Sequence, residues 1–126
     1  MCVCVCVCVH VGYVYWSDQS LKRISRSQCL TEGTSCQSEP IVTHLVDTVS
    51  SLAVDTVTQL LYWVDSGRRR IELMKIPAGP RTVLVWRDLD SPRAITLHHD
   101  SGSACTYETY LKHTHTNSAF ACSNYV

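Results

Sequence analysis

The sequence lacks both net charge and a long apolar run. Eleven Lys and Arg residues balance eleven Asp and Glu residues, so bulk charge does not favour nucleic acid or anionic lipid as a partner. The continuous apolar stretch at residues 2–9 is far shorter than the roughly 20 residues that a membrane-spanning helix needs. It also lacks the basic flank and the small-residue cleavage site of a secretory signal. We therefore expect no signal peptide, no transmembrane segment and no nucleic-acid partner for this chain.

The sequence also lacks the motifs that mark common enzymes. It contains no glycine-rich phosphate-binding loop, no Gly-x-Ser-x-Gly and no His-Glu-x-x-His. His113, His115 and Cys122 do not have the spacing of a zinc site. We therefore expect no enzymatic activity, no catalytic residue, no cofactor and no bound metal.

Four short apolar runs are present instead, at residues 51–55, 60–65, 70–76 and 81–86. Each run has the length of a strand and its content of Leu, Val, Ile and aromatic residues. Residues that favour turns separate the runs, and no window has the spacing and length of an amphipathic helix. The pattern predicts one antiparallel four-stranded sheet.

The core of this sheet is predicted around Trp63. Neighbouring residues on a strand point to opposite faces, so Tyr62 and Trp63 require that both faces of the sheet be covered. We expect Trp63 to be among the most buried residues, together with Leu52, Val54, Leu61 and Ile71.

Parts of the pattern recur on both sides of this region. Residues 15–18 match residues 62–65 at an offset of 47, and residues 90–97 match residues 47–54 at an offset of 43. A four-stranded unit that repeats every 40–50 residues is typical of β-propeller blades. A third Tyr-Trp-x-Asp motif should begin at residue 105, where the sequence reads Cys-Thr-Tyr-Glu and the pattern fails.

These repeats resemble the Tyr-Trp-Thr-Asp (class B) repeats of the low-density lipoprotein receptor family. The resemblance implies an all-β fold, an incomplete β-propeller with one full four-stranded blade and parts of two others, from a family fold of six blades. Residues 1–11 are then a low-complexity Cys-Val tract, residues 12–102 a partial propeller and residues 103–126 an irregular tail. The structural motif residues that carry the resemblance are Tyr15, Trp16, Asp18, Tyr62, Trp63, Asp65, Arg70 and Glu72.

The resemblance also implies a function, as a fragment of the extracellular protein-binding propeller of a cell-surface receptor. Complete proteins of this kind are single-pass membrane receptors whose propellers bind protein ligands on one rim. The run at residues 83–95 resembles the receptor-related branch of the family. The implied partners are agrin, a muscle kinase complex and secreted regulators of Wnt signalling, at the extracellular face of the plasma membrane. No ligand-contact residue is identified.

Two charged features each have two interpretations. Asp65 lies at the end of its predicted strand. It is either a structural carboxylate that accepts hydrogen bonds from turn amides or a catalytic carboxylate. The same residue type recurs at Asp18, which favours the structural role. The cluster Arg68-Arg69-Arg70 is either a strand residue with two solvated neighbours or a docking patch for an acidic partner.

The Cys-Val tract leaves three interpretations open. Strict alternation is compatible with a strand that has all its cysteines on one face. Cys-x-Cys pairs also bind soft metals, which would make the chain a Cys-rich metal-thiolate peptide. A TG dinucleotide repeat translates as alternating Cys and Val, which predicts a truncated or mispredicted product without activity. In addition, a disulfide between Cys29 and Cys36 is compatible with an oxidising compartment.

The number of repeats bears on stability. Blades are stabilised mainly through interfaces with their neighbours, and even a complete domain has a net stability of only about 5–15 kcal/mol. The predicted blades are too few to close a ring. We therefore expect that the isolated polypeptide is not an independently folding, active receptor.

Overall fold

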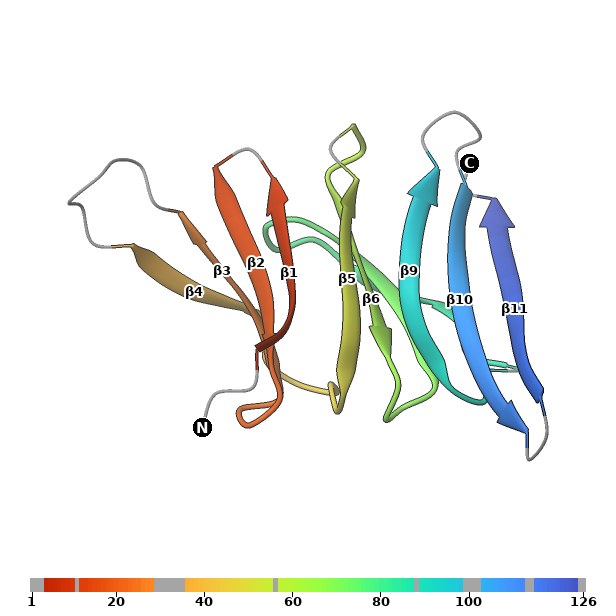
Figure 1. The fold of residues 1–126 in the computed structure, drawn as a ribbon. Coiled ribbons are helices and arrows are strands. Elements are labelled where there is room, and N and C mark those ends of the chain that lie inside the picture. Colours follow the sequence, from red (N-terminus) through yellow and green to blue (C-terminus); the bar gives the residue numbers. More distant parts are fainter. Residues whose placement is uncertain are drawn as a thin grey trace.

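The computed structural model describes the backbone of residues 4–10, 12–28, 36–55, 57–87, 89–98, 103–112 and 115–124, and the side chains of residues 12–28, 36–55, 57–87 and 89–97. Within these residues the regular elements are all strands, arranged in three antiparallel sheets (Figure 1). The chain completes each sheet before it starts the next.

The first sheet has the order β1-β2-β3-β4, the second β5-β6-β7-β8 and the third β11-β10-β9. The strands are β1 Cys4–His10, β2 Tyr13–Asp18, β3 Arg23–Gln28, β4 Gln37–Val42, β5 Val49–Asp55, β6 Leu60–Asp65, β7 Arg70–Lys75, β8 Arg81–Val85, β9 Pro92–His98, β10 Ser103–Lys112 and β11 His115–Asn124.

The second sheet confirms the four-stranded unit predicted from the apolar runs. Its strands differ from the predicted ranges by two residues at most, because β5 begins at Val49 and β8 ends at Val85. Turn residues separate the strands as expected. After β7, the Gly79 amide donates to the Lys75 carbonyl at 2.7 Å and closes the turn toward β8.

Two hydrophobic cores cover the two faces of the second sheet. Trp63 lies in a core with residues of the first sheet, including Tyr15, Ile24 and Val42. Tyr62, its neighbour in the sequence, lies in the other core with Ile95 of the third sheet. The opposite orientation of the two aromatic side chains, predicted from the strand period, is therefore confirmed.

The predicted core residues are buried. Trp63 and Leu61 are 0 % exposed and Ile71 is 1 % exposed. Leu52 and Val54 are also buried, whereas Arg68 and Arg70 are half-buried and Arg69 is exposed. The register of the strands is therefore the one that places the apolar set inside.

The first sheet is more complete than predicted. The Cys-Val tract forms β1, which pairs with β2 from Cys4–Asp18 to His10–Tyr13, so the first blade has four strands rather than a part of them. Alternation of β-branched valine with cysteine satisfies the strand period. The cysteine side chains of this tract lie outside the described residues.

The third sheet corrects the prediction of an irregular tail at residues 103–126. β10 pairs with β9, beginning with Ser103 opposite His98. On its other edge β10 pairs with β11, beginning with Ser103 opposite Asn124. The loss of the Tyr-Trp-x-Asp motif at residue 105 removes the side chains typical of the family, but backbone pairing requires only an extended chain beside an open strand edge. Residues 90–97, which match residues 47–54 at the offset of 43, contain most of β9, as residues 47–54 contain most of β5.

The first strands of the three sheets lie side by side, as Figure 1 shows for β1, β5 and β9. Polar contacts join neighbouring sheets near these strands. Ser17 Oγ donates to the Val49 carbonyl at 3.4 Å, and the Ile95 amide donates to Ser51 Oγ at 3.2 Å. This stacking of antiparallel sheets around their first strands is the arrangement of propeller blades.

Replacing Trp63 by Ala should destabilise the chain strongly, because it leaves a cavity between the first and second sheets. We expect a loss of about 3–5 kcal/mol in urea unfolding measured in trimethylamine N-oxide, an osmolyte that favours compact states.

Trp86→Ala is the matched control, because this indole is 61 % exposed and surface substitutions usually change stability by less than about 0.5 kcal/mol. Equal losses for the two tryptophans would contradict the assignment of the core.

Candidate functional site

The carboxylate of Asp65 holds the segment that connects the first and second sheets. Its oxygens accept hydrogen bonds from the backbone amides of Asp47 at 2.9 Å, Thr48 at 3.0 Å and Arg68 at 3.1 Å. Asp65 is 0 % exposed. The hydrogen bond from Arg68 belongs to the turn between β6 and β7, whereas the other two fix the residues that precede β5. The carboxylate thus stabilises a turn and a connection between blades.

The same turn occurs in the first sheet at the offset of 47 residues. Asp18 Oδ1 accepts a hydrogen bond from the Leu21 amide at 2.9 Å, which corresponds to the bond from Arg68 to Asp65. Lys22 and Arg69 occupy equivalent positions and both have a positive φ, of 49° and 51°. These contacts are the ones expected of a carboxylate that caps a turn.

Asp47 links the two turns to each other. Its side chain forms an ion pair with Lys22 of the first turn, and this partner holds the pKa of the Asp47 carboxyl below its usual value. The same side chain passes over Gly67 of the second turn. A Cβ atom at Gly67 would lie 1.9 Å from Asp47 Oδ2, so any other residue there would force the Asp47 side chain to move.

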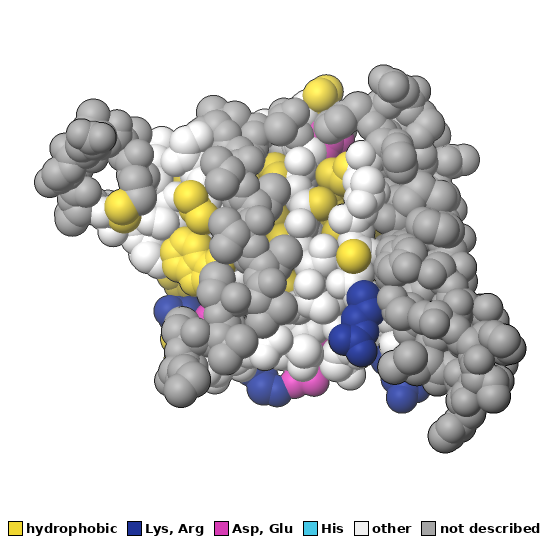
Figure 2. Space-filling model, in the orientation of Figure 1, with side chains coloured by type: hydrophobic (Ala, Val, Ile, Leu, Met, Phe, Trp, Pro, Cys, Tyr) yellow, Lys and Arg dark blue, Asp and Glu magenta, His cyan; other side chains and the backbone are white. Residues whose placement is uncertain are grey.

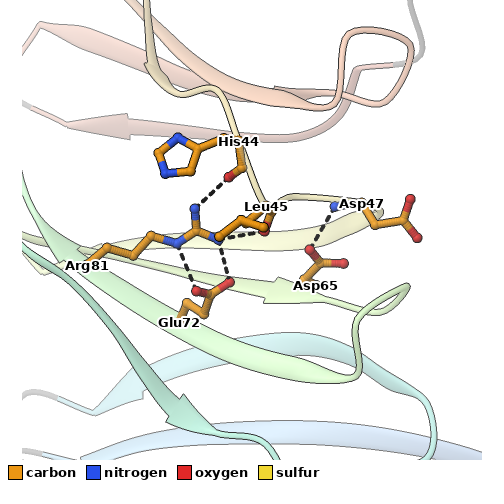
Figure 3. A network of polar contacts seen from close by, with 6 residues as sticks. All are labelled: His44, Leu45, Asp47, Asp65, Glu72 and Arg81. Atoms are coloured by element: carbon orange, nitrogen blue, oxygen red, sulfur yellow. Dashed lines mark hydrogen bonds and ion pairs between the residues drawn. The ribbon is translucent and has the colours of Figure 1, made fainter.

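A buried ion pair holds the connecting segment at a second point (Figure 3). Arg81 Nε and one terminal nitrogen of Arg81 donate to the two carboxylate oxygens of Glu72, each at 2.8 Å. The terminal nitrogens also donate to the carbonyls of His44 and Leu45, both at 2.6 Å. Glu72 is 2 % exposed, so the bidentate contact with Arg81 compensates the cost of burying its carboxylate.

Arg81 is the residue of this network that the sequence reasoning missed. Its guanidinium carbon lies 5.1 Å from the centre of the Trp63 ring, within the range of a cation–π contact. Glu72 could have indicated this partner. It lies opposite Trp63 on the buried face, where a carboxylate requires a cation. Arg81 faces the same side, since it is paired with Met74, two residues after Glu72.

The aromatic motif residues occupy equivalent places in the two sheets. Tyr15 and Tyr62 both point toward the following sheet, and each is 1 % exposed. Trp63 points back toward the first sheet. Trp16 follows Tyr15 on β2 and therefore points to the opposite face, where it is half-buried.

Arg70 takes part in an open groove rather than in the polar network. The groove has a volume of about 390 Å³ and is lined by Arg68, Arg70, Val83 and Trp86. Two of the three arginines of the predicted cluster therefore border one surface depression. Arg69 is exposed.

Comparison with known proteins identifies the repeats. Residues 59–99 match the family described as low-density lipoprotein receptor repeat class B. Low-density lipoprotein receptor-related protein 5 of Mus musculus is 41 % identical over 86 residues, which are 68 % of this chain and 5 % of that protein. The chain carries class B repeats of the low-density lipoprotein receptor family.

The match with a second relative spans a larger share of that relative's length. Low-density lipoprotein receptor-related protein 5-like protein of Homo sapiens is 32 % identical over 91 residues, which are 72 % of this chain and 34 % of that protein. The chain therefore spans only a small part of these relatives. The sequence of residues 83–95 resembles low-density lipoprotein receptor-related protein 4. Receptor-related protein 5 belongs to the same family.

A solved structure shows the same fold. A chain of the crystal structure of a nidogen/laminin complex superposes with a TM-score of 0.81 at 25 % sequence identity, over 98 % of this chain and 44 % of that chain. That neighbour is a β-propeller of the Tyr-Trp-Thr-Asp type. The three sheets are therefore blades of a partial class B propeller.

The described part of these class B repeats holds neither a metal-ligand cluster nor a membrane-spanning helix. No group of three or more His, Cys, Asp or Glu residues is close enough there to bind a metal ion. No helix of sufficient length and hydropathy occurs in the same residues. Cys36 is in a disulfide, but Cys29 and the Cys-Val tract lie outside the described side chains, so the predicted pairing and the metal-thiolate hypothesis stay predictions.

Burial affects the tyrosine of the second class B motif. The pKa of Tyr62 is raised, mainly because the buried site disfavours the phenolate and also because the charge of Asp55 repels it. The neutral phenol is thus the form that belongs in the core between the second and third sheets.

The ion pair between Glu72 and Arg81 should behave as one unit in a double-mutant cycle. Arg81→Ala leaves the Glu72 charge buried and unpaired, so we expect a loss of about 3–5 kcal/mol in urea unfolding. The double variant Glu72→Ala/Arg81→Ala should lose less than the sum of the two single changes. Arg93→Ala, at an exposed position, is the control, and strictly additive losses would argue against the pair.

Tyr62 should make the chain sensitive to alkaline pH. Its pKa in the folded state lies above the ordinary value, so the stabilisation from the neutral phenol is fully present below about pH 10. Above that pH the unfolded state releases its proton first, and stability falls as the pH rises toward the pKa of the folded state. Tyr62→Phe should show a smaller decrease between about pH 9 and 11 in urea midpoints. Parallel curves for the two proteins would refute the assignment.

Proposed function

We propose that this chain is a protein-binding segment of the extracellular propeller of a cell-surface receptor in the low-density lipoprotein receptor-related family. It acts by binding rather than by catalysis. Support comes from receptor-related relatives and from a propeller fold that also occurs in a complex of two proteins, nidogen and laminin.

The observation that carries the proposal is a rigid rim with exposed side chains. The turns β2–β3 and β6–β7 lie at the same edge of the molecule, at the bottom of Figure 1. Asp18 and Asp65 hold the backbone of these turns through buried carboxylates. Leu21, Lys22 and Arg69 in the same turns are exposed. Loops with a fixed backbone and free side chains on a rigid scaffold are where binding residues concentrate.

The proposed ligands are extracellular proteins, namely agrin, a muscle kinase complex and secreted regulators of Wnt signalling. The family resemblance of the sequence supports this set, whereas the receptor-related relatives and the nidogen/laminin neighbour support the coarser class, an extracellular protein ligand. The proposed location is the extracellular face of the plasma membrane, as in a receptor of this family.

Binding to immobilised agrin, to the kinase ectodomain and to a Wnt regulator tests the proposal. The chain of residues 1–126 is secreted from a eukaryotic host and measured in trimethylamine N-oxide, with serum albumin as the negative control. We expect saturable binding to at least one ligand, and weaker binding for Asp65→Ala, because that change releases the backbone of the rim.

Two other outcomes would contradict the proposed receptor function. A chain that unfolds cooperatively but binds none of the ligands would contradict the receptor function. A chain without a cooperative transition even in osmolyte would favour the alternative, a truncated or mispredicted product without activity.

A further inference from the structure

An open groove lies beside the polar network on the second sheet. Arg70 stands two residues before Glu72 on β7, and Val83 of β8 is paired with Glu72. Both therefore face the side of the sheet that carries Trp63. Arg68 and Trp86 complete the lining, and the groove has a volume of about 390 Å³.

The groove has an excess of positive charge. Among the described residues, none of the ion pairs involves Arg68 or Arg70. The Nε atom of Arg68 is buried and has no acceptor within the described part of the chain. Of the neighbouring carboxylates, Glu72 is paired with Arg81 and Asp47 with Lys22, and Asp65 accepts hydrogen bonds from backbone amides. Arg68 also interacts with the charge of Asp47 but forms no ion pair with it among the described residues.

Charged side chains of both signs lie along the adjoining rim. Figure 2 shows that the Lys and Arg side chains visible on that face of the molecule lie in its lower half, where acidic side chains are also visible. This is the edge at which Figure 1 places the turns β2–β3 and β6–β7.

An apolar wall accompanies the charge. The Trp86 side chain is 61 % exposed and Val83 is 38 % exposed. The guanidinium carbon of Arg87 lies 4.1 Å from the centre of the Trp86 ring, which holds the indole beside a third cation. A surface that combines arginines with an exposed tryptophan is typical of a protein-binding hot spot and suits a ligand with both acidic and apolar side chains.

The open edge of β8 provides the backbone contacts for such a ligand. β8 is the last strand of the second sheet, so its outer amides and carbonyls face away from β7. An extended peptide adds to an edge of this kind as a further strand, and every second side chain then points to the same face of the sheet. For a peptide beside β8, that face carries the groove.

We propose that the groove of Arg68, Arg70, Val83 and Trp86 binds an extended acidic segment of a protein partner. Carboxylates of the segment pair with the two arginines, and an apolar side chain on the same face of the added strand packs on Trp86. The inference builds on the proposed function, because it states where and how a protein ligand is recognised. It also gives a role to the arginine cluster of the β6–β7 turn.

A labelled heptapeptide, acetyl-Thr-Asp-Thr-Glu-Thr-Val-Thr-amide, is a suitable probe in fluorescence anisotropy with the full chain, because its Asp, Glu and Val side chains lie on one face of an extended strand. We expect saturable binding that weakens as salt is raised, and at least tenfold weaker binding for Arg68→Ala/Arg70→Ala. Trp86→Ala should weaken it several-fold. Arg69→Ala, in the same turn but outside the groove, should stay within twofold. A peptide with Lys in place of Asp and Glu should not bind.

The controls separate this proposal from the receptor function. Urea midpoints of the variants should match that of the parent chain, because the buried contacts of this turn use the Arg68 backbone amide and not its side chain. If the parent chain does not bind the peptide while agrin or a Wnt regulator binds equally to parent and double variant, the groove proposal is wrong and the receptor function stands. If the peptide binds as predicted and no protein ligand does, the groove stands and the receptor function fails.

A polysaccharide is the competing occupant. Binding of a heparin oligosaccharide that excludes the peptide and is unaffected by Trp86→Ala would overturn the assignment to a peptide. Equal peptide affinity for the parent, the double variant and Arg69→Ala would overturn the site.

Discussion

The buried carboxylate of Asp65 is the constraint on which the arrangement of the first two sheets depends. Its hydrogen bonds to the amides of Asp47 and Thr48 fix the start of β5, and its bond to Arg68 fixes the turn after β6. A buried carboxylate is tolerated only when its charge is satisfied. The position of the connecting segment follows from this requirement, and the ion pair of Glu72 with Arg81 adds a second attachment at His44 and Leu45.

The two cores explain why a single blade is not a folding unit. Trp63 is buried only because the first sheet covers it, and Tyr62 is buried beside Ile95 of the third sheet. A sheet with large aromatic residues on both faces needs two neighbours, so stability is shared among blades. The same architecture leaves the turns at one edge free to carry variable side chains, which is the property that a protein-binding rim requires.

Much of this could be predicted from residue patterns. The apolar runs located β5 to β8 within two residues, and the match at the offset of 47 located β2. The carboxylate role of Asp65 followed from its place at a strand end. The strands β10 and β11 could not be predicted, because their sequence carries no family motif and they form by backbone pairing, β10 with β9 and β11 with β10. Arg81 was missed because its partners, Glu72 and two carbonyls, come from different parts of the chain.

The sequence by itself determined the class of the fold, the family and the faces of the strands, because these depend on local period and on repeated motifs. Only the tertiary structure decided which charges meet. It paired Asp47 with Lys22 and Glu72 with Arg81, and it left Arg68 and Arg70 beside Trp86 in an open groove. The reason is physical: such contacts join residues on different strands and loops, and their distances are set by how the sheets stack and not by spacing along the chain.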